Sequence, residues 1–297
     1  MPLAFKAQAT YQAPRNQTQM ITSPFPDLDS WVMYFRSADI PVLRHTVTEL
    51  DKLREKADSV NARTVSGVIL SDPLMTLRVL AYIEKHRSKS QTTDITTIER
   101  ALMMIGMGPF FRAFEHMPLV EEELAAHPKA LLGLLKVIQR ARRASTWARE
   151  WGLMRKDLDV DEITVAALLH DTAELLMWCF APTLALNVRE MQVADKHMRS
   201  SAAQEAIYGI NLHDLQIDLA LAWHLPKLLT TLMDHSDGEN SHREQNVKLA
   251  VDLARHSANG WDDAALPDDY KGICELLHIS HETLYKKLGI DAPPAAE

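Results

Sequence analysis

The stretch DEITVAALLHDTAELLMWCF, from Asp161 to Phe180, decides the fold prediction for this chain. Apolar residues fill both of its ends, and His170 and Asp171 interrupt them at the centre. Because neighbouring positions of an α-helix lie about 100° apart, both side chains can reach one point from a single helix, with Glu174 one turn after His170. Ionisable side chains in an apolar helix are costly unless they pair or bind a metal ion. The stretch therefore predicts a buried helix with a polar pair, and a His-Asp pair in the core is the simpler alternative to a metal site.

The composition predicts an all-α globular protein. The 297 residues are 46% hydrophobic and 24% charged, and only 10 of them are glycine. Apolar residues recur every three to four positions over long segments, which is the period of an amphipathic helix. No repeat of fixed period is present, and this argues against a helical solenoid.

Charge and cysteine content argue against several classes of protein. The formal net charge is −8, so the chain lacks the basic balance typical of nucleic-acid binding. Cys179 and Cys274 both lie among apolar residues of expected helices, so we expect buried free thiols in a reducing compartment. The chain shows no uninterrupted run of about 18 apolar residues and no signal-peptide core, so we expect a cytoplasmic protein that does not bind a membrane.

Three regions are expected along the chain. Residues 1–25 are polar and weakly patterned at first, and we expect a flexible tail. Residues 26–125 are predicted to form a first helical lobe. A charged stretch that ends at Pro128 separates it from residues 126–297, which are predicted to form a second helical lobe with additional C-terminal helices.

Individual residues predict where helices begin and end. Asp72 before Pro73 predicts a helix start, because aspartate caps orphan N–H groups and proline suits the first helical position. Gly106 predicts a helix end with a left-handed cap. A long helix is expected from Lys129 to Trp151, ending at Gly152.

Short motifs in both halves of the chain form one ordered set. Those of the first half are Ile40-Pro41-Val42-Leu43, Ser71-Asp72-Pro73-Leu74 and the run from Ile95 to Ala101 followed by Gly106. Those of the second half are Leu168-Leu169-His170-Asp171, Tyr208-Gly209-Ile210 with His213, Ala222-Trp223-His224-Leu225-Pro226 and Asp234-His235. In order and spacing the set resembles the HDOD domain, a helical bacterial signalling module related to the HD phosphohydrolases. The resemblance implies two helical lobes, of which the second is similar to an HD domain.

The resemblance also implies a candidate site around the polar pair. HD phosphohydrolases bind a divalent metal ion through a histidine on an earlier helix, the His-Asp pair and later His or Asp residues. The metal lowers the pKa of a bound water, which then attacks a phosphoester. The candidate site in this chain comprises Arg143, His170, Asp171, Glu174, His213, Asp234 and His235.

The metal-binding set that the resemblance implies is incomplete in this chain. Arg143 takes the position of the earlier-helix histidine, and no histidine occurs from Lys129 to Trp151. An arginine there places a permanent positive charge where a metal ion would lie, so we expect Arg143 to pair with Asp171 or Glu174. The related cyclic-dinucleotide phosphodiesterases carry a lysine where this chain has Glu174, and their glycine-tyrosine-proline signature is absent.

Three functions remain open from the sequence. The resemblance favours a regulatory module in signal transduction, which binds signalling proteins or a ligand without catalysis and needs no cofactor. The first alternative is a phosphohydrolase acting on a nucleotide or cyclic dinucleotide, with Mg, Mn, Fe or Zn held by His170 and Asp171. The second alternative is a site that binds a nucleotide through Arg143 without cleaving it. The missing ligand argues against an enzyme, because loss of one ligand costs orders of magnitude in activity.

Overall fold

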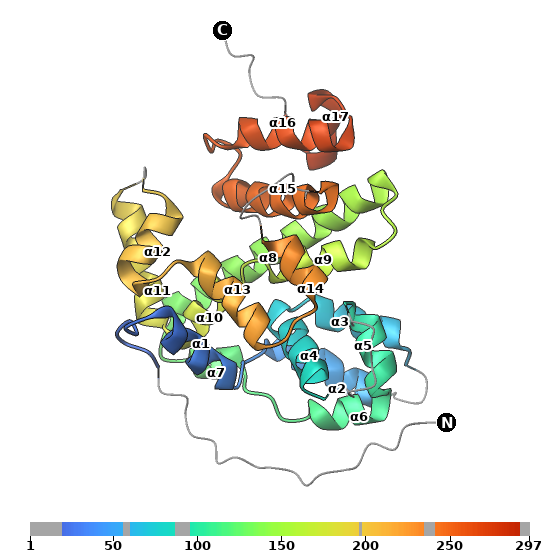
Figure 1. The fold of residues 1–297 in the computed structure, drawn as a ribbon, viewed down its shortest axis with the longest axis vertical. Coiled ribbons are helices and arrows are strands. Elements are labelled where there is room, and N and C mark those ends of the chain that lie inside the picture. Colours follow the sequence, from blue (N-terminus) through green and yellow to red (C-terminus); the bar gives the residue numbers. More distant parts are fainter. Residues whose placement is uncertain (1–19, 56–59, 87–95, 196–197, 235–240, 292–297) are drawn as a thin grey trace.

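The structure is a computed structural model that describes residues 20–55, 60–86, 96–195, 198–234 and 241–291 (Figure 1). In the first half of the chain the helices are α1 (Leu28–Ser37), α2 (Arg44–Arg54), α3 (Ala62–Leu70), α4 (Pro73–Lys85), α5 (Ile98–Ile105), α6 (Met107–Ala113) and α7 (Val120–Glu123). In the second half they are α8 (Pro128–Arg155), α9 (Val160–Leu169), α10 (Thr172–Phe180), α11 (Pro182–Ala194), α12 (Ser200–Tyr208), α13 (Leu212–Ala222), α14 (Lys227–Met233), α15 (His242–His256), the 3-10 turn η1 (Ser257–Asn259), α16 (Leu266–Leu277) and α17 (His281–Leu288). The all-α prediction is confirmed: within the described ranges the sole β-type pairing is an isolated bridge between Val42 and Leu119.

The buried side chain of Asp72 connects the beginnings of α2 and α4. One of its carboxylate oxygens accepts hydrogen bonds from the N–H groups of Leu74 and Met75, which caps α4 as predicted. The other oxygen accepts from Leu43 N–H and the Thr46 hydroxyl, at the start of α2. Burial raises the pKa of the Asp72 carboxyl, although these hydrogen bonds oppose the shift. One buried side chain thus joins the beginnings of two helices.

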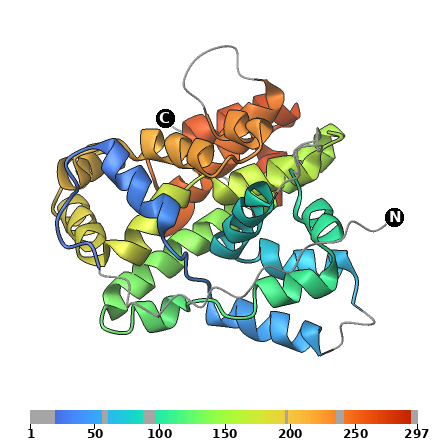
Figure 2. The ribbon, with the colours of Figure 1, turned by 60° about the horizontal axis from the view of Figure 1, so that its bottom comes forward.

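The long helix α8 runs through the middle of the molecule. Figure 2 shows it, in green, between the light-blue-to-teal helices α2–α6 and the orange-to-red helices of the second half. The prediction that it ends at Gly152 is wrong, because α8 continues to Arg155 and a left-handed Lys156 caps it. Gly152 instead serves packing, since a Cβ there would lie 3.3 Å from the Val160 side chain.

The stretch quoted first is broken where a continuous helix was predicted. Helix α9 ends at Leu169 and α10 begins at Thr172, so His170 and Asp171 occupy the junction. Gln216 of α13 fills the gap: its amide donates to the Leu169 carbonyl oxygen at 3.1 Å, and its oxygen accepts from the Ala173 N–H at 2.9 Å. A side chain from elsewhere therefore replaces the missing backbone hydrogen bonds.

The broken stretch is part of the core. Among the residues the structure describes, Val160–Phe180 is the one helical segment long and apolar enough to cross a membrane by length and composition. Its most apolar window is 89% buried inside the protein. Cys179 at its end is a buried free thiol, and so is Cys274 of α16, as predicted.

Elements of the first 40 residues lie against the second half of the chain. Helix α1 packs on α13, and Trp31 meets Tyr208 edge to face with ring centroids 6.3 Å apart. Of the expected tail, residues 1–19 lie outside the described residues. Ile21 is buried, and its N–H donates to the Phe180 carbonyl oxygen at 2.8 Å. The boundary between residues 26–125 and 126–297 stays a prediction.

Candidate functional site

The junction between α9 and α10 places its polar pair against two other helices. Because the backbone turns at this point, the side chain of Asp171 reaches both α8 and α15. We call the resulting group of side chains the arginine–acid cluster. It consists of Arg140 from α8, His170 and Asp171 from the junction, Glu174 from α10 and Arg255 from α15.

Arg140 bridges the two carboxylates of the cluster. Its Nε and Nη2 donate to Asp171 Oδ2 at 2.9 and 2.6 Å, and Nη2 also lies 2.5 Å from Glu174 Oε2. The side chains are largely shielded from solvent, with exposed fractions of 14% for Arg140 and 8% for Asp171. Shielding makes these charge-assisted hydrogen bonds stronger than the same contacts at the surface.

The second oxygen of Asp171 is also engaged. Arg255 Nη2 donates to Asp171 Oδ1 at 3.2 Å, and His170 Nδ1 lies 3.2 Å from the same oxygen. Two guanidinium groups thus face the two carboxylates of Asp171 and Glu174, so the formal charges of these four groups cancel.

The cluster keeps Asp171 ionised. Burial by itself would raise the pKa of the Asp171 carboxyl, but Arg140, followed by Arg255 and His170, outweighs burial and holds that pKa well below its ordinary value. Burial likewise opposes the charge of Arg140, and Asp171 and Glu174 outweigh it and raise the pKa of the guanidinium. The ion pair is therefore charged on both sides at physiological pH.

The expectation that Arg143 pairs with Asp171 or Glu174 is wrong, since Arg140, three residues earlier, makes both contacts. Arg143 Nη2 instead donates to Ser257 Oγ at 3.2 Å. A signal for Arg140 was present in the sequence. It interrupts the buried stripe of small and apolar residues along α8, which comprises Gly133, Val137, Ala141, Ala144 and Ala148.

Two of the remaining candidates are described: His213 lies on α13, and Asp234 follows the end of α14. His213 Nε2 is 3.4 Å from Asp234 Oδ1, and both side chains are partly exposed. His235 lies outside the described residues. Within the described part of the chain, no group of three or more His, Cys, Asp or Glu side chains is placed to hold a metal ion. Together with the two guanidinium groups on Asp171, this means that the described side chains do not form the ligand set that the resemblance implies.

Comparison with known proteins places the fold. Residues 40–238 match the model of the HDOD domain. The structure is similar to the MmoQ response regulator from Methylococcus capsulatus str. Bath, with 16% identity and a TM-score of 0.61 over 85% of this chain and 99% of that chain. It is also similar to a virulence factor from Campylobacter jejuni subsp. jejuni, with 18% identity and a TM-score of 0.63 over 90% of this chain and 94% of that chain. At such identities the similarity shows a shared fold. No curated protein matches the sequence.

Proposed function

The chain belongs to the HDOD domain family, and on this premise we propose that it is a cytoplasmic regulatory module that acts in signal transduction by binding, without catalysis. Its partners are signalling proteins. The description of one structural neighbour as a response regulator agrees with such a role.

The bridge from Arg140 to Asp171 and Glu174 carries the proposal. Hydrolysis by metal-activated water needs carboxylate and histidine ligands that converge on one cation. Here guanidinium nitrogens engage both oxygens of Asp171. A metal ion at Asp171 would have to displace Arg140, and breaking a buried ion pair typically costs about 3–5 kcal/mol. The cluster is therefore suited to stabilising the α8–α9–α10 junction.

Metal content and turnover, measured on one preparation of the full chain, test this proposal. The protein is incubated with Mn²⁺, Fe²⁺ or Zn²⁺ in turn and desalted. Elemental analysis then gives the metal content, and hydrolysis of bis-(p-nitrophenyl) phosphate gives the turnover. We expect no stoichiometric metal, and hydrolysis no faster than that of the Asp171→Ala variant.

A surface variant serves as the matched control. Asp161→Ala removes a carboxylate from an exposed ion pair with Arg149 and leaves the cluster intact. Stoichiometric metal with turnover, both retained in Asp161→Ala and lost in His170→Ala, would overturn the proposal and establish the phosphohydrolase alternative.

A further inference from the structure

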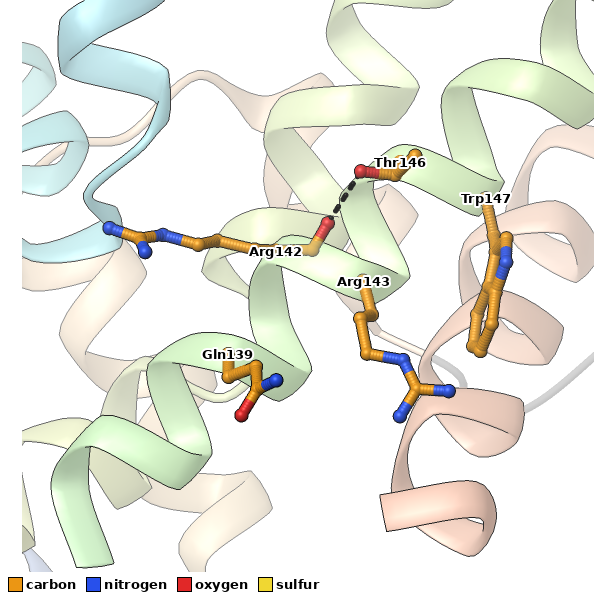
Figure 3. A pocket seen from close by; sticks show the side chains of 5 residues that line it. All are labelled: Gln139, Arg142, Arg143, Thr146 and Trp147. Carbon is orange, nitrogen blue, oxygen red and sulfur yellow. Dashed lines mark hydrogen bonds between the residues drawn. The ribbon is translucent and has the colours of Figure 1, made fainter. Parts of the chain in front are cut away.

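A depression of about 230 Å³ lies on the solvent side of α8 (Figure 3). Its lining residues are spaced by three and four positions and so occupy one face of the helix. They are Gln139, Arg142, Arg143, Thr146 and Trp147. Two of the lining side chains reach other segments, since Arg142 Nε donates to the Ser71 carbonyl oxygen and Arg143 donates to Ser257 Oγ.

Arg143 is held in place without being neutralised. Its guanidinium carbon lies 4.9 Å from the ring centre of Trp147 and 5.8 Å from that of Trp261. Two aromatic rings and one hydroxyl restrict the plane of the guanidinium, and none of them carries a negative charge. Since arginine has five N–H donors in a fixed fork, most of them stay available to a ligand.

Arg142 and Arg143 have no acidic partner in the described part of the chain, a feature that Arg155 of the same helix shares, since it donates to the Leu276 carbonyl oxygen. In the described ranges no carboxylate forms an ion pair with Arg142 or Arg143, whereas on the same helix Arg140 pairs with two carboxylates and Arg149 with one. The whole chain has 40 acidic and only 32 basic side chains, so acidic partners are in excess. Arg143 is thus an uncompensated cation beside the depression, on a protein of net charge −8, and forms a local site for an anion, whereas the guanidinium of Arg142 points away from Arg143 toward Ser71 (Figure 3).

We propose that this depression binds a small phosphate monoester, with the phosphate on the guanidinium of Arg143. A phosphate monoester carries about −1.5 to −2 charges at neutral pH and a carboxylate carries only one, so the phosphate is attracted more strongly to the uncompensated guanidinium of Arg143. A planar guanidinium fork suits two phosphate oxygens at once. The volume is below the roughly 300–1,000 Å³ of pockets for drug-sized ligands, so the group esterified to phosphate is small.

Binding to the full chain is measured by isothermal titration calorimetry with phenyl phosphate, benzoate and inorganic phosphate. Phenyl phosphate and benzoate share a ring and differ in the anion. We expect saturable binding of phenyl phosphate with a Kd of about 1 mM or below, and binding of benzoate at least about tenfold weaker. Absence of saturation by phenyl phosphate, or equal affinity for benzoate, would overturn the proposal. If inorganic phosphate binds as tightly as phenyl phosphate, the site recognises phosphate alone, and the proposal of a monoester as its ligand is overturned.

Variants of α8 locate the site. Arg143→Gln should weaken binding of phenyl phosphate about tenfold or more, and Arg143→Lys should weaken it less because it keeps the charge. Arg142→Gln should have a smaller effect than Arg143→Gln, because the guanidinium of Arg142 points away toward Ser71. Arg149→Gln, an exposed arginine of the same helix that already has an acidic partner, should leave the Kd unchanged. Circular dichroism and the thermal midpoint confirm that each variant is folded. Unchanged affinity in Arg143→Gln would refute the site.

The phosphate site and the non-catalytic role are separable. Loss of phenyl phosphate binding in Arg143→Gln leaves the contacts of Arg140 with Asp171 in place, so the metal and turnover assay is unaffected. Phosphodiester turnover at the arginine–acid cluster would overturn the proposed non-catalytic role. It would not affect the proposal that the depression on α8 binds a phosphate monoester.

Discussion

At the scale of the residue, Gln216 supports the junction that presents His170 and Asp171. Its side chain pairs with one carbonyl and one N–H that the break between α9 and α10 leaves without helical partners. Replacing it by leucine should lower the free energy of unfolding by about 1–3 kcal/mol, because the buried Ala173 N–H is left unsatisfied, whereas the Leu169 carbonyl oxygen keeps its hydrogen bond from the Thr172 hydroxyl. Urea denaturation measures the change.

The control for Gln216 is a glutamine whose hydrogen bond is at the surface. Gln192 donates to the Ser200 hydroxyl at 2.8 Å, outside the core. Gln192→Leu should change the unfolding free energy by no more than about 0.5 kcal/mol. Equal effects of the two substitutions would contradict the role of Gln216 in the junction.

Asp171 should make stability depend on pH in the acid range. Its pKa in the folded protein lies below the value in the unfolded chain, so its contribution is fully present above the unfolded pKa and is lost as the pH falls through the folded pKa. The unfolding free energy of the wild type should exceed that of Asp171→Asn most clearly near neutral pH. The difference should shrink progressively below about pH 4, as measured by urea denaturation at a series of pH values.

The matched comparison for Asp171 is an exposed acid. Asp161 pairs with Arg149 at 2.7 Å, but both side chains are about half exposed to solvent. Surface pairs contribute roughly 0–1 kcal/mol, so Asp161→Asn should track the wild type across the whole pH series. A constant difference between the wild type and Asp171→Asn at every pH would contradict the ion-pair assignment.

At the scale of the element, the close approach of α8 and α10 depends on Gly133. A Cβ at this position would lie 2.5 Å from ring atoms of Trp178. Alanine is the better helix former by about 1 kcal/mol, yet overpacking costs about 1–3 kcal/mol, so Gly133→Ala should be net destabilising. Thermal or urea denaturation gives the sign of the change in the free energy of unfolding.

Gly67 in α3 provides the opposite case. No atom lies within 4 Å of a Cβ built there, and the residue is exposed. Gly67→Ala should therefore stabilise the protein by up to about 1 kcal/mol through helix propensity alone. Stabilisation by both alanine substitutions would show that Trp178 moves aside without cost.

Helix ends were predictable where the signal is local. Asp72 and Pro73 begin α4, and Gly106 with its positive φ ends α5, because a cap acts on the backbone next to it. The break at His170 was not predictable in this way. It relies on Gln216, which belongs to α13 and comes near only once the chain has folded.

The candidate site shows the same limit. His170, Asp171 and Glu174 could be singled out because ionisable residues interrupt an apolar run. The partner arginine was misassigned, since two arginines three residues apart on α8 differ mainly in the direction they face. Only the packing of α8 against α9 and α10 turns Arg140 inward and leaves Arg143 beside Ser257.

At the scale of the whole molecule, both cysteines should be protected by the folded state. Cys179 and Cys274 are buried, and burial raises the pKa of each thiol, so little reactive thiolate is present at neutral pH. Reaction with a disulfide reagent should be slow in the native protein and complete in urea. Cys274 should react before Cys179, because α16 packs mainly on α15, whereas α10 packs on α4, α8, α11 and α13. Immediate reaction of Cys179 in the native protein would contradict this order.

The central position of α8 has a consequence for how the molecule opens. This helix contacts α4 from the first half of the chain and α9, α10, α11, α15 and α16 from the second. Its backbone amides can therefore meet solvent only when both halves separate, and their hydrogen exchange should report global unfolding. Helix α17, which packs chiefly on α16, should exchange through local opening and much faster. Mass spectrometry of peptides after hydrogen exchange would thus show slow exchange in α8, at the centre of the molecule, and fast exchange in α17, at its edge.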